Sequence, residues 1–303
     1  MVSPEFQFFI NSWDFLKTEF VSRDTGSWGL AVSKRTQEWQ KPQENRTEPG
    51  SCQWLFGKCQ HIGSRAKQED NCAFAEGNYH GKPALLAILA DGMGGMHNGA
   101  AYSRIAVDIF LNNYQKAFDE IKEPPSALLY LAMLANREAN RIYDDECPGG
   151  TTLLSALFID DVFYTLSIGD SRIALFRPTA KKELVPLQIN RVHVLGASLD
   201  ERAWSGMISF EDADGNTYRN SLTASIGSKQ IRRVDLTEQP YRFLRSDWLV
   251  LMSDGIFRSV SEYRIAAALC SDPQSAAENV VNQICAKNMP DQDNMSILVI
   301  KRA

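Results

Sequence analysis

The chain has 303 residues, of which 44% are hydrophobic and 23% are charged, with a net charge of −5. This composition is ordinary for a globular protein, and a chain of this length can bury a core without crosslinks. The negative net charge and the lack of a basic stripe argue against a nucleic-acid partner. No apolar run approaches the roughly 20 residues that a membrane span requires.

Residues 1–52 differ from the rest of the chain. An aromatic-rich segment from Phe6 to Phe20 precedes a polar stretch from Val21 to Gly50 that has little periodicity. Because Trp13 and its aromatic neighbours are costly to leave in water, we expect a partly ordered N-terminal extension over residues 1–52 and one domain over residues 53–303. The start carries Glu5 and lacks a basic segment, so it is a poor signal peptide. With six scattered cysteines and no zinc-knuckle spacing, we expect a cytoplasmic protein.

From Trp54 onward, apolar runs alternate with turn residues. The continuous apolar run Ala84–Ala90 predicts a strand that is covered on both faces. Helical spacing predicts a helix from Asn98 to Phe118, and a Pro-Pro start predicts another from Ser126 to about Tyr143. Further strands are predicted at residues 151–159, 162–168, 172–177, 248–252 and 295–300, and further helices at 261–270 and 273–287.

Strands linked by hairpins, with helices grouped in pairs, favour a layered α+β fold over a doubly wound parallel sheet. Residues 178–222 are polar and irregular, with several Gly, Asp and Asn. We interpret them as a long flap-like insertion, and such insertions are usually functional or mobile.

Acidic residues recur where the predicted strands begin or end, namely Glu69, Asp70, Asp91, Asp170, Asp254 and Asp293. Two of them open an Asp-Gly pair, which singly indicates only a turn. Strands of one sandwich can bring such ends to a single edge, where crowded carboxylates have raised pKa values unless cations neutralise them. Hard divalent cations with oxygen ligands, Mg²⁺ or Mn²⁺, would meet that need.

These acidic residues belong to a series of seven short sequence motifs. They are Arg65–Asn71 (RAKQEDN), Asp91–Gly95 (DGMGG), Gly150–Thr152 (GTT), Gly169–Arg172 (GDSR), Leu222–Gly227 (LTASIG), Ser253–Gly255 (SDG) and Asp293–Asn294 (DN). Each is weak alone, but together and in this order over residues 62–303 they are specific. The sequence resembles the metal-dependent serine/threonine protein phosphatases, the type 2C family, in their bacterial form.

The resemblance implies an α-β-β-α sandwich of two mainly antiparallel sheets flanked by helix pairs, with a two-metal site at one end. By position, the protein ligands of two Mn²⁺ or Mg²⁺ ions would be Asp70, Asp91, the Gly92 carbonyl, Asp254 and Asp293. Asp91 would bridge both ions, and Glu69 would act through a metal-bound water. Asp170 matches a residue that helps hold a third, weaker ion in some members, although a hairpin turn also favours Gly-Asp there.

The same resemblance implies hydrolysis of phosphoserine and phosphothreonine in proteins without a protein nucleophile. Two ions lower the pKa of a bridging water, and the resulting hydroxide attacks phosphorus in line. Arg65 is the candidate phosphate-binding cation because a guanidinium can bind phosphate through two hydrogen bonds, while the alternative is a surface arginine in a salt bridge. We expect a monomer that acts on phosphoproteins and opposes a serine/threonine kinase.

The sequence departs from the family pattern at several positions. Met93 stands where many eukaryotic members have His, and Gln68 replaces the usual Asn before Glu-Asp. Arg258 stands where an acid is more usual after the second Asp-Gly, and the T-x-D-H-S element is missing after Pro186. Two other functions stay open: a catalytically silent phosphatase-like module that binds phosphoproteins, and a hydrolase of small phosphoesters.

Overall fold

The computed structural model describes residues 54–93, 98–143, 149–269 and 272–303, all within the unit Ser51–Ala303. The expected N-terminal extension over residues 1–52 lies outside the described residues, and the domain boundary next to it stays a prediction. Among the described residues, no helix has the length and apolar character needed to cross a membrane.

One sheet of the described domain has five strands, each antiparallel to its neighbours, in the order β1-β13-β12-β8-β9. These strands are β1 (Trp54–His61), β13 (Met295–Arg302), β12 (Trp248–Met252), β8 (Arg172–Pro178) and β9 (Leu184–Gln188). The first and last strands of the chain's described part therefore pair with each other along their whole length, from Trp54 with Arg302 to His61 with Met295.

The second sheet has six strands, again antiparallel, in the order β10-β7-β6-β3-β2, with β11 also paired to β7. The strands are β10 (Asp235–Leu236), β7 (Val162–Ile168), β6 (Leu153–Ile159), β3 (Lys82–Ala90), β2 (Asn71–Tyr79) and β11 (Tyr241–Arg242). A separate short pair joins β4 (Gly92–Met93) to β5 (Gly150–Thr151).

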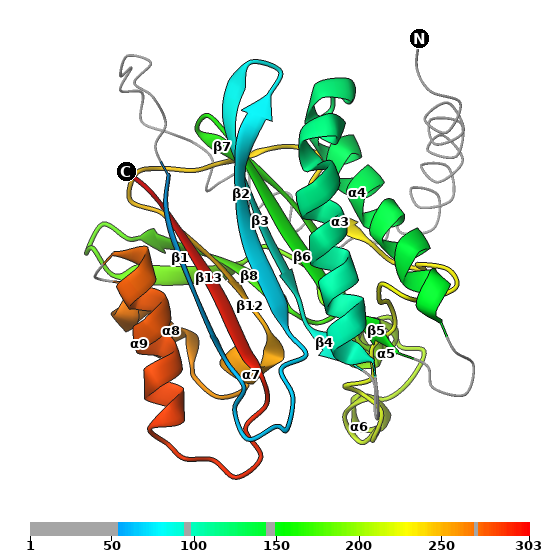
Figure 1. Cartoon of the computed structure of the whole chain (residues 1–303). Coiled ribbons are helices and arrows are strands. Elements are labelled where there is room, and N and C mark those ends of the chain that lie inside the picture. Colours follow the sequence, from blue (N-terminus) through cyan, green and yellow to red (C-terminus); the bar gives the residue numbers. More distant parts are fainter. Residues whose placement is uncertain (1–53, 94–97, 144–148, 270–271) are drawn as a thin grey trace. The chain divides into compact units, whose positions relative to one another are not determined.

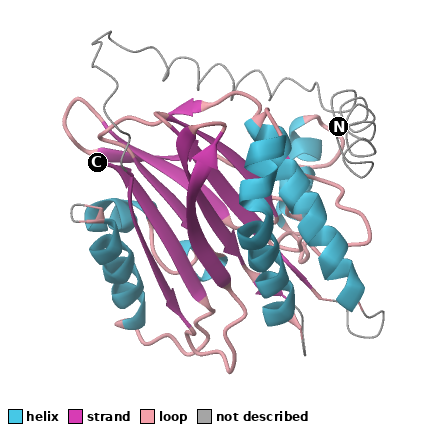
Figure 2. Ribbon diagram, turned by 45° about the horizontal axis from the view of Figure 1, so that its top comes forward, coloured by secondary structure: helices cyan, strands magenta, loops and turns pink. Residues whose placement is uncertain are grey.

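Helices cover the outer faces of both sheets (Figures 1 and 2). On the six-stranded sheet lie α3 (Gly99–Glu120) and α4 (Pro124–Ala139), and α4 continues into the short 3-10 helix η1 (Asn140–Ile142). On the five-stranded sheet lie α8 (Glu262–Ala268) and α9 (Pro273–Cys285). Asp272 caps α9, because its side chain accepts hydrogen bonds from the backbone of Gln274 and Ser275, and Pro273 fits the first helical position.

The core is built from strands that are apolar on both faces. In β12, Leu249 and Leu251 point to the space between the sheets, while Trp248, Val250 and Met252 pack under α8 and α9. Side chains in a strand alternate between faces, so a strand between a sheet and a helix layer must be apolar throughout. The predicted α-β-β-α sandwich with mainly antiparallel sheets is confirmed.

The expectation for residues 178–222 was wrong in part. Leu184–Gln188 is not irregular but forms the edge strand β9, and two short helices follow, α5 (Leu195–Trp204) and α6 (Phe210–Asp214). Pro186 obscures this strand in the sequence, yet an edge strand tolerates proline because one side of it makes no ladder hydrogen bonds. The helices α5 and α6 enclose their own small apolar cluster of Leu199, Ala203 and Ala213.

Candidate active site

Acidic residues from both sheets meet at one pocket of about 230 Å³. The residues that line it are Arg65, Glu69, Asp91, Gly92, Met93, Thr152, Asp170, Leu222, Asp254, Asp293 and Asn294. Seven of the eight site residues predicted from the sequence thus line one cavity. The eighth, Asp70, is only 2% exposed and does not line the pocket, but its charge acts on Asp91.

The strand ends bring these side chains together. Asp91 follows β3 and Asp170 lies in the turn between β7 and β8. Asp254 follows β12 by two residues and is the first residue of the short helix α7 (Asp254–Phe257). Because neighbouring antiparallel strands run in opposite directions, β3 ends where β2 begins, with Ala90 opposite Asn71. All these ends lie at the same edge, at the bottom of Figure 1.

Asp91 is held by its backbone. Its N–H donates to Thr152 Oγ1 at 3.0 Å, and its carbonyl accepts from the Thr152 N–H at 2.9 Å. Thr152 Oγ1 lies 2.8 Å from Ser171 Oγ, so the turn that carries Asp170 joins the same network. A Cβ on Gly92 would lie 2.3 Å from the carbonyl oxygen of Gly99, a distance that leaves room for glycine alone. The backbone at Gly92 therefore packs directly against the start of α3.

Asn294 holds the loop that carries Arg65 and Glu69. Its Oδ1 accepts from the Glu69 N–H at 2.8 Å, and its Nδ2 donates to the carbonyls of Ile62 and Lys67 at 2.8 and 3.0 Å. Ser103 of α3 donates to the Glu69 carbonyl at 2.5 Å from the other side. Asp293-Asn294 matches a motif of the family, but nothing in the local sequence pattern indicates these long-range contacts of Asn294.

Burial raises the pKa values of several pocket carboxylates, and for Asp91 and Asp254 the charges of neighbouring carboxylates add to this effect. Desolvation, and then the charges of Asp70 and Asp254, raise the pKa of Asp91 well above its usual range. Burial raises the pKa of Asp70 to about 6, against hydrogen bonds from Ser296 and Ser253 that lower it. Burial likewise raises the pKa of Asp254 to about 6 and that of Asp170 in the same direction. The site thus concentrates more negative charge than its surroundings neutralise.

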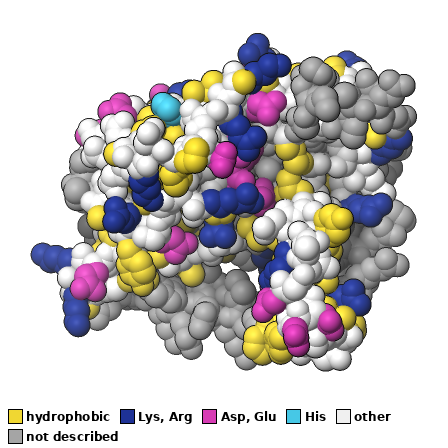
Figure 3. All heavy atoms as spheres, turned by 90° about the horizontal axis from the view of Figure 1, so that it is seen from below, with side chains coloured by type: hydrophobic (Ala, Val, Ile, Leu, Met, Phe, Trp, Pro, Cys, Tyr) yellow, Lys and Arg dark blue, Asp and Glu magenta, His cyan; other side chains and the backbone are white. Residues whose placement is uncertain are grey.

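Two arginines face this charge. Arg65 Nη2 lies 2.7 Å from Asp293 Oδ2, and Arg258 lies 3.0 Å from Asp254 Oδ2 and 3.5 Å from Asp170 Oδ2. Figure 3, which views this end of the molecule, shows acidic and basic side chains gathered near the centre of the face. Arg258 was missed as a site residue; its spacing of four from Asp254 predicts contact only once α7 is known to be helical.

The donors suit a hard cation. Asp70 Oδ2 is buried and has no hydrogen-bond partner among the described residues, although a buried carboxylate oxygen normally has one. The other side chains that could bind a cation here are also carboxylates, the donors that Mg²⁺ and Mn²⁺ prefer. As they stand, no three of the described His, Cys, Asp and Glu side chains are arranged to hold a metal ion. Oxygens of Asp254, Asp293 and Asp170 face arginines instead.

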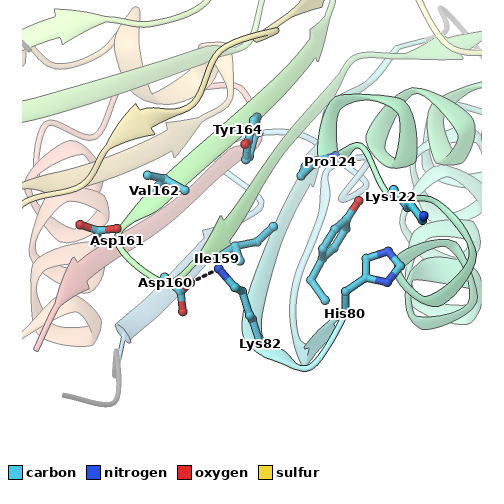
Figure 4. Close-up of a pocket in the computed structure, with 10 residues that line it drawn as sticks. His80, Lys82, Lys122, Pro124, Ile159, Asp160, Asp161, Val162 and Tyr164 are labelled. Carbon is cyan, nitrogen blue, oxygen red and sulfur yellow. Dashed lines mark hydrogen bonds and ion pairs between the residues drawn. The ribbon is translucent and has the colours of Figure 1, made fainter. Parts of the chain in front are cut away.

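A second, larger pocket of about 660 Å³ lies at the other end of β3 and β6 (Figure 4). Its lining residues include Tyr164, Lys122 and the pair Lys82–Asp160, whose Nζ and Oδ2 atoms are 2.8 Å apart. Because Lys82 and Asp160 neutralise each other and none of the predicted site residues lies there, the carboxylate pocket is the stronger candidate for catalysis.

Comparisons of the sequence and of the structure with known proteins point to the same family. The family model described as protein phosphatase 2C matches residues 59–284. The protein phosphatase PhpP of Streptococcus pneumoniae is 29% identical over 219 residues, which are 71% of this chain and 85% of that protein. The S. agalactiae serine/threonine phosphatase has a similar structure, with a TM-score of 0.65, 23% identity and coverage of 82% and 99% of the two chains.

The catalytic domain of the serine/threonine protein phosphatase PstP, solved in complex with two manganese ions, is also similar. Its TM-score is 0.61 at 22% identity, with 82% of this chain and 98% of that chain covered.

Proposed function

The chain belongs to the protein phosphatase 2C family, and from this premise we propose that the carboxylate pocket is its active site. Membership makes the chain a metal-dependent serine/threonine protein phosphatase, whose substrates are phosphoproteins. The strongest support for the proposed location is the gathering of Glu69, Asp91, Asp170, Asp254 and Asp293 around one pocket, beside two arginines.

We assign the metal ligands to the carboxylates at the strand ends. Asp70, Asp91, Asp254, Asp293 and the Gly92 carbonyl would hold two divalent cations, Mn²⁺ or Mg²⁺, with Glu69 acting through water. When bound, such cations lower the pKa of a coordinated water and offset charge on the phosphoryl oxygens. Burial raises the pKa values of Asp70, Asp91 and Asp254, so these carboxylates need a nearby positive charge to stay ionised, and this need supports the assignment.

Arg65 is proposed to bind the substrate phosphate. It lines the pocket and its side chain is 58% exposed, so the guanidinium can reach a phosphoryl group at the pocket mouth. Its present partner, Asp293, is one of the proposed metal ligands. We therefore propose that Arg65 exchanges this carboxylate for the phosphate, to which it can donate two parallel hydrogen bonds.

Met93 lines the pocket but cannot supply a proton, because a thioether has none to give. The leaving serine or threonine alkoxide must then be protonated from water. Asp91 and Gly92, fixed against Thr152 and Gly99, keep this part of the pocket in place during the reaction.

We further propose that the enzyme acts in the cytoplasm as a monomer and opposes a serine/threonine kinase. A catalytically silent binding module is not favoured, since every predicted carboxylate is present and all but Asp70 line the pocket. Hydrolysis of small phosphoesters as the main activity is not favoured either, since the relatives that the chain matches are named protein phosphatases or serine/threonine phosphatases.

The test is a phosphatase assay of the full chain with p-nitrophenyl phosphate and a panel of phosphopeptides. Hydrolysis should require Mn²⁺ or Mg²⁺, stop with EDTA, favour phosphopeptides, and be lost in Asp254→Asn. Activity of Asp254→Asn equal to wild type would contradict the assignment of the pocket, and failure to hydrolyse any phosphopeptide would contradict the proposed substrates.

A further inference from the structure

Arg258 joins two carboxylates of the pocket that come from different segments of the chain. Its Nη1 lies 3.0 Å from Oδ2 of Asp254, and its Nη2 lies 3.5 Å from Oδ2 of Asp170. Asp254 and Arg258 are four residues apart, so one turn of α7 places them on the same side. Asp170 arrives from the turn between β7 and β8. One guanidinium therefore spans the space between the two acids.

The backbone around Arg258 is anchored on both sides. The guanidinium carbon of Arg172 lies over the ring of Phe257, 4.1 Å from the centroid of that ring. On the other side, the hydroxyl of Ser259 donates to Gln292 Oε1 at 2.9 Å. The side chain of Arg258 therefore starts from a fixed position, and its contacts with the two acids do not depend on a mobile loop.

The two acids need a positive charge. The side chains of Asp170 and Asp254 are only 11% and 17% exposed, so both carboxylates are largely removed from water, and Arg258 contacts both of them. A guanidinium stays charged at every physiological pH, so this cation is permanent. A divalent ion between the same acids would compete for the same two Oδ2 atoms and would lie beside a like charge.

We infer that Arg258 is a built-in cation that takes the place of a divalent ion between Asp170 and Asp254. The inference rests on the proposed function and deepens it: this chain binds two metal ions, and Asp170 pairs with arginine instead of helping to hold a third. Arg258 is then a positioning residue, which holds the Asp254 carboxylate at the pocket. The departure of the sequence at this position, an arginine where an acid is more usual, agrees with such an exchange.

The experiment is isothermal titration calorimetry of the full chain with Mn²⁺ for wild type and Arg258 variants. Wild type should bind two Mn²⁺ per chain. Arg258→Asp, which supplies a third carboxylate, should bind three, with the additional ion at least tenfold weaker than the others. Arg258→Lys, which keeps the charge, should bind two. The double variant Arg258→Asp, Asp170→Asn should return to two, because the added site needs Asp170.

Arg264→Ala, which removes an exposed arginine from the next helix, is the matched control and should leave the binding of Mn²⁺ unchanged. Thermal unfolding of each variant checks the fold, and Arg258→Ala should also gain a weak site if the Asp variant fails to fold. The same two-ion stoichiometry in wild type, Arg258→Asp and Arg258→Ala would overturn the inference, as would three ions in wild type. If wild type binds no Mn²⁺ and hydrolyses no phosphopeptide, the proposed function itself fails, and the inference with it.

Discussion

Asp70 is predicted to destabilise the chain when no metal is bound. It is 2% exposed, and its Oδ2 has no hydrogen-bond partner among the described residues. Burial raises its pKa from 3.8 to about 6. Replacing the carboxylate with the neutral amide of Asn keeps the shape and removes the buried charge, so Asp70→Asn should stabilise the metal-free chain while weakening the binding of Mn²⁺.

The magnitude follows from the pKa shift of Asp70. A shift of about 2 pKa units at 1.36 kcal/mol per unit corresponds to about 3 kcal/mol. The folded state binds the proton more tightly than the unfolded state. In the metal-free wild type, the contribution of Asp70 to stability is therefore fully present below about pH 4 and is lost as the pH rises through about 6. For a domain of this size, about 3 kcal/mol moves Tm by roughly 6–12 °C.

The assay is thermal unfolding in EDTA at pH 7.5 and pH 5. Asp70→Asn should have a higher Tm than wild type at pH 7.5, and the difference should shrink at pH 5. Saturating Mn²⁺ should raise the Tm of wild type, because a ligand that binds only the folded state stabilises it, and should raise the variant less.

Asp247→Asn is the matched control. Asp247 is also buried, but Arg177 Nε and Nη2 lie 2.8 and 2.5 Å from its two oxygens. Removing one partner of such a pair costs about 3–5 kcal/mol, so this variant should lose stability with or without metal. If Asp70→Asn also lowers Tm in EDTA at pH 7.5, Asp70 is a structural acceptor and the reasoning is refuted.

Three further outcomes are expected. Arg65→Ala should lower kcat/KM on a phosphopeptide about tenfold or more with little change in Mn²⁺ affinity, and Lys should restore it only in part; wild-type kinetics would make Arg65 a surface arginine. Gly92→Ala should lower both Tm and kcat, since the added Cβ meets the Gly99 carbonyl at 2.3 Å, whereas Gly215→Ala should change little. Burial lowers the pKa of His193 to about 4, so the folded protein resists protonation of His193 and loses stability as the pH falls below about 6.5. In urea unfolding, wild type should lose about 2 kcal/mol more stability than His193→Gln between pH 7.5 and pH 5. An equal loss of stability in the two proteins would contradict this.

Part of the fold could be predicted from the sequence because its central strands are apolar on both faces. The runs that became β3, β7 and β12 are short, continuous and bounded by turn residues, so their ends were predicted to within two residues. Asp91, Asp170 and Asp254 lie within two residues of the ends of these strands, and their meeting at one edge follows from the sandwich.

Some other elements could not be predicted from the local sequence pattern. The edge strand β1 contains Gly57 and Lys58 and is largely exposed, so it lacks an apolar run. The edge strand β9 contains Pro186, and α7 is too short to show a helical period. The roles of Asn294 and Arg258 depend on contacts with segments far away in the chain, which no local pattern encodes.

The most direct test of the proposed active site is the rate of phosphothreonine-peptide hydrolysis by wild type and Asp91→Ala, each measured with Mn²⁺ and with EDTA. Wild type should be active with Mn²⁺ and inactive with EDTA, and Asp91→Ala should be inactive in both while remaining folded. Full wild-type activity in EDTA, or an Asp91→Ala enzyme that keeps more than about a tenth of kcat, a loss of less than ~1.4 kcal/mol, would contradict it.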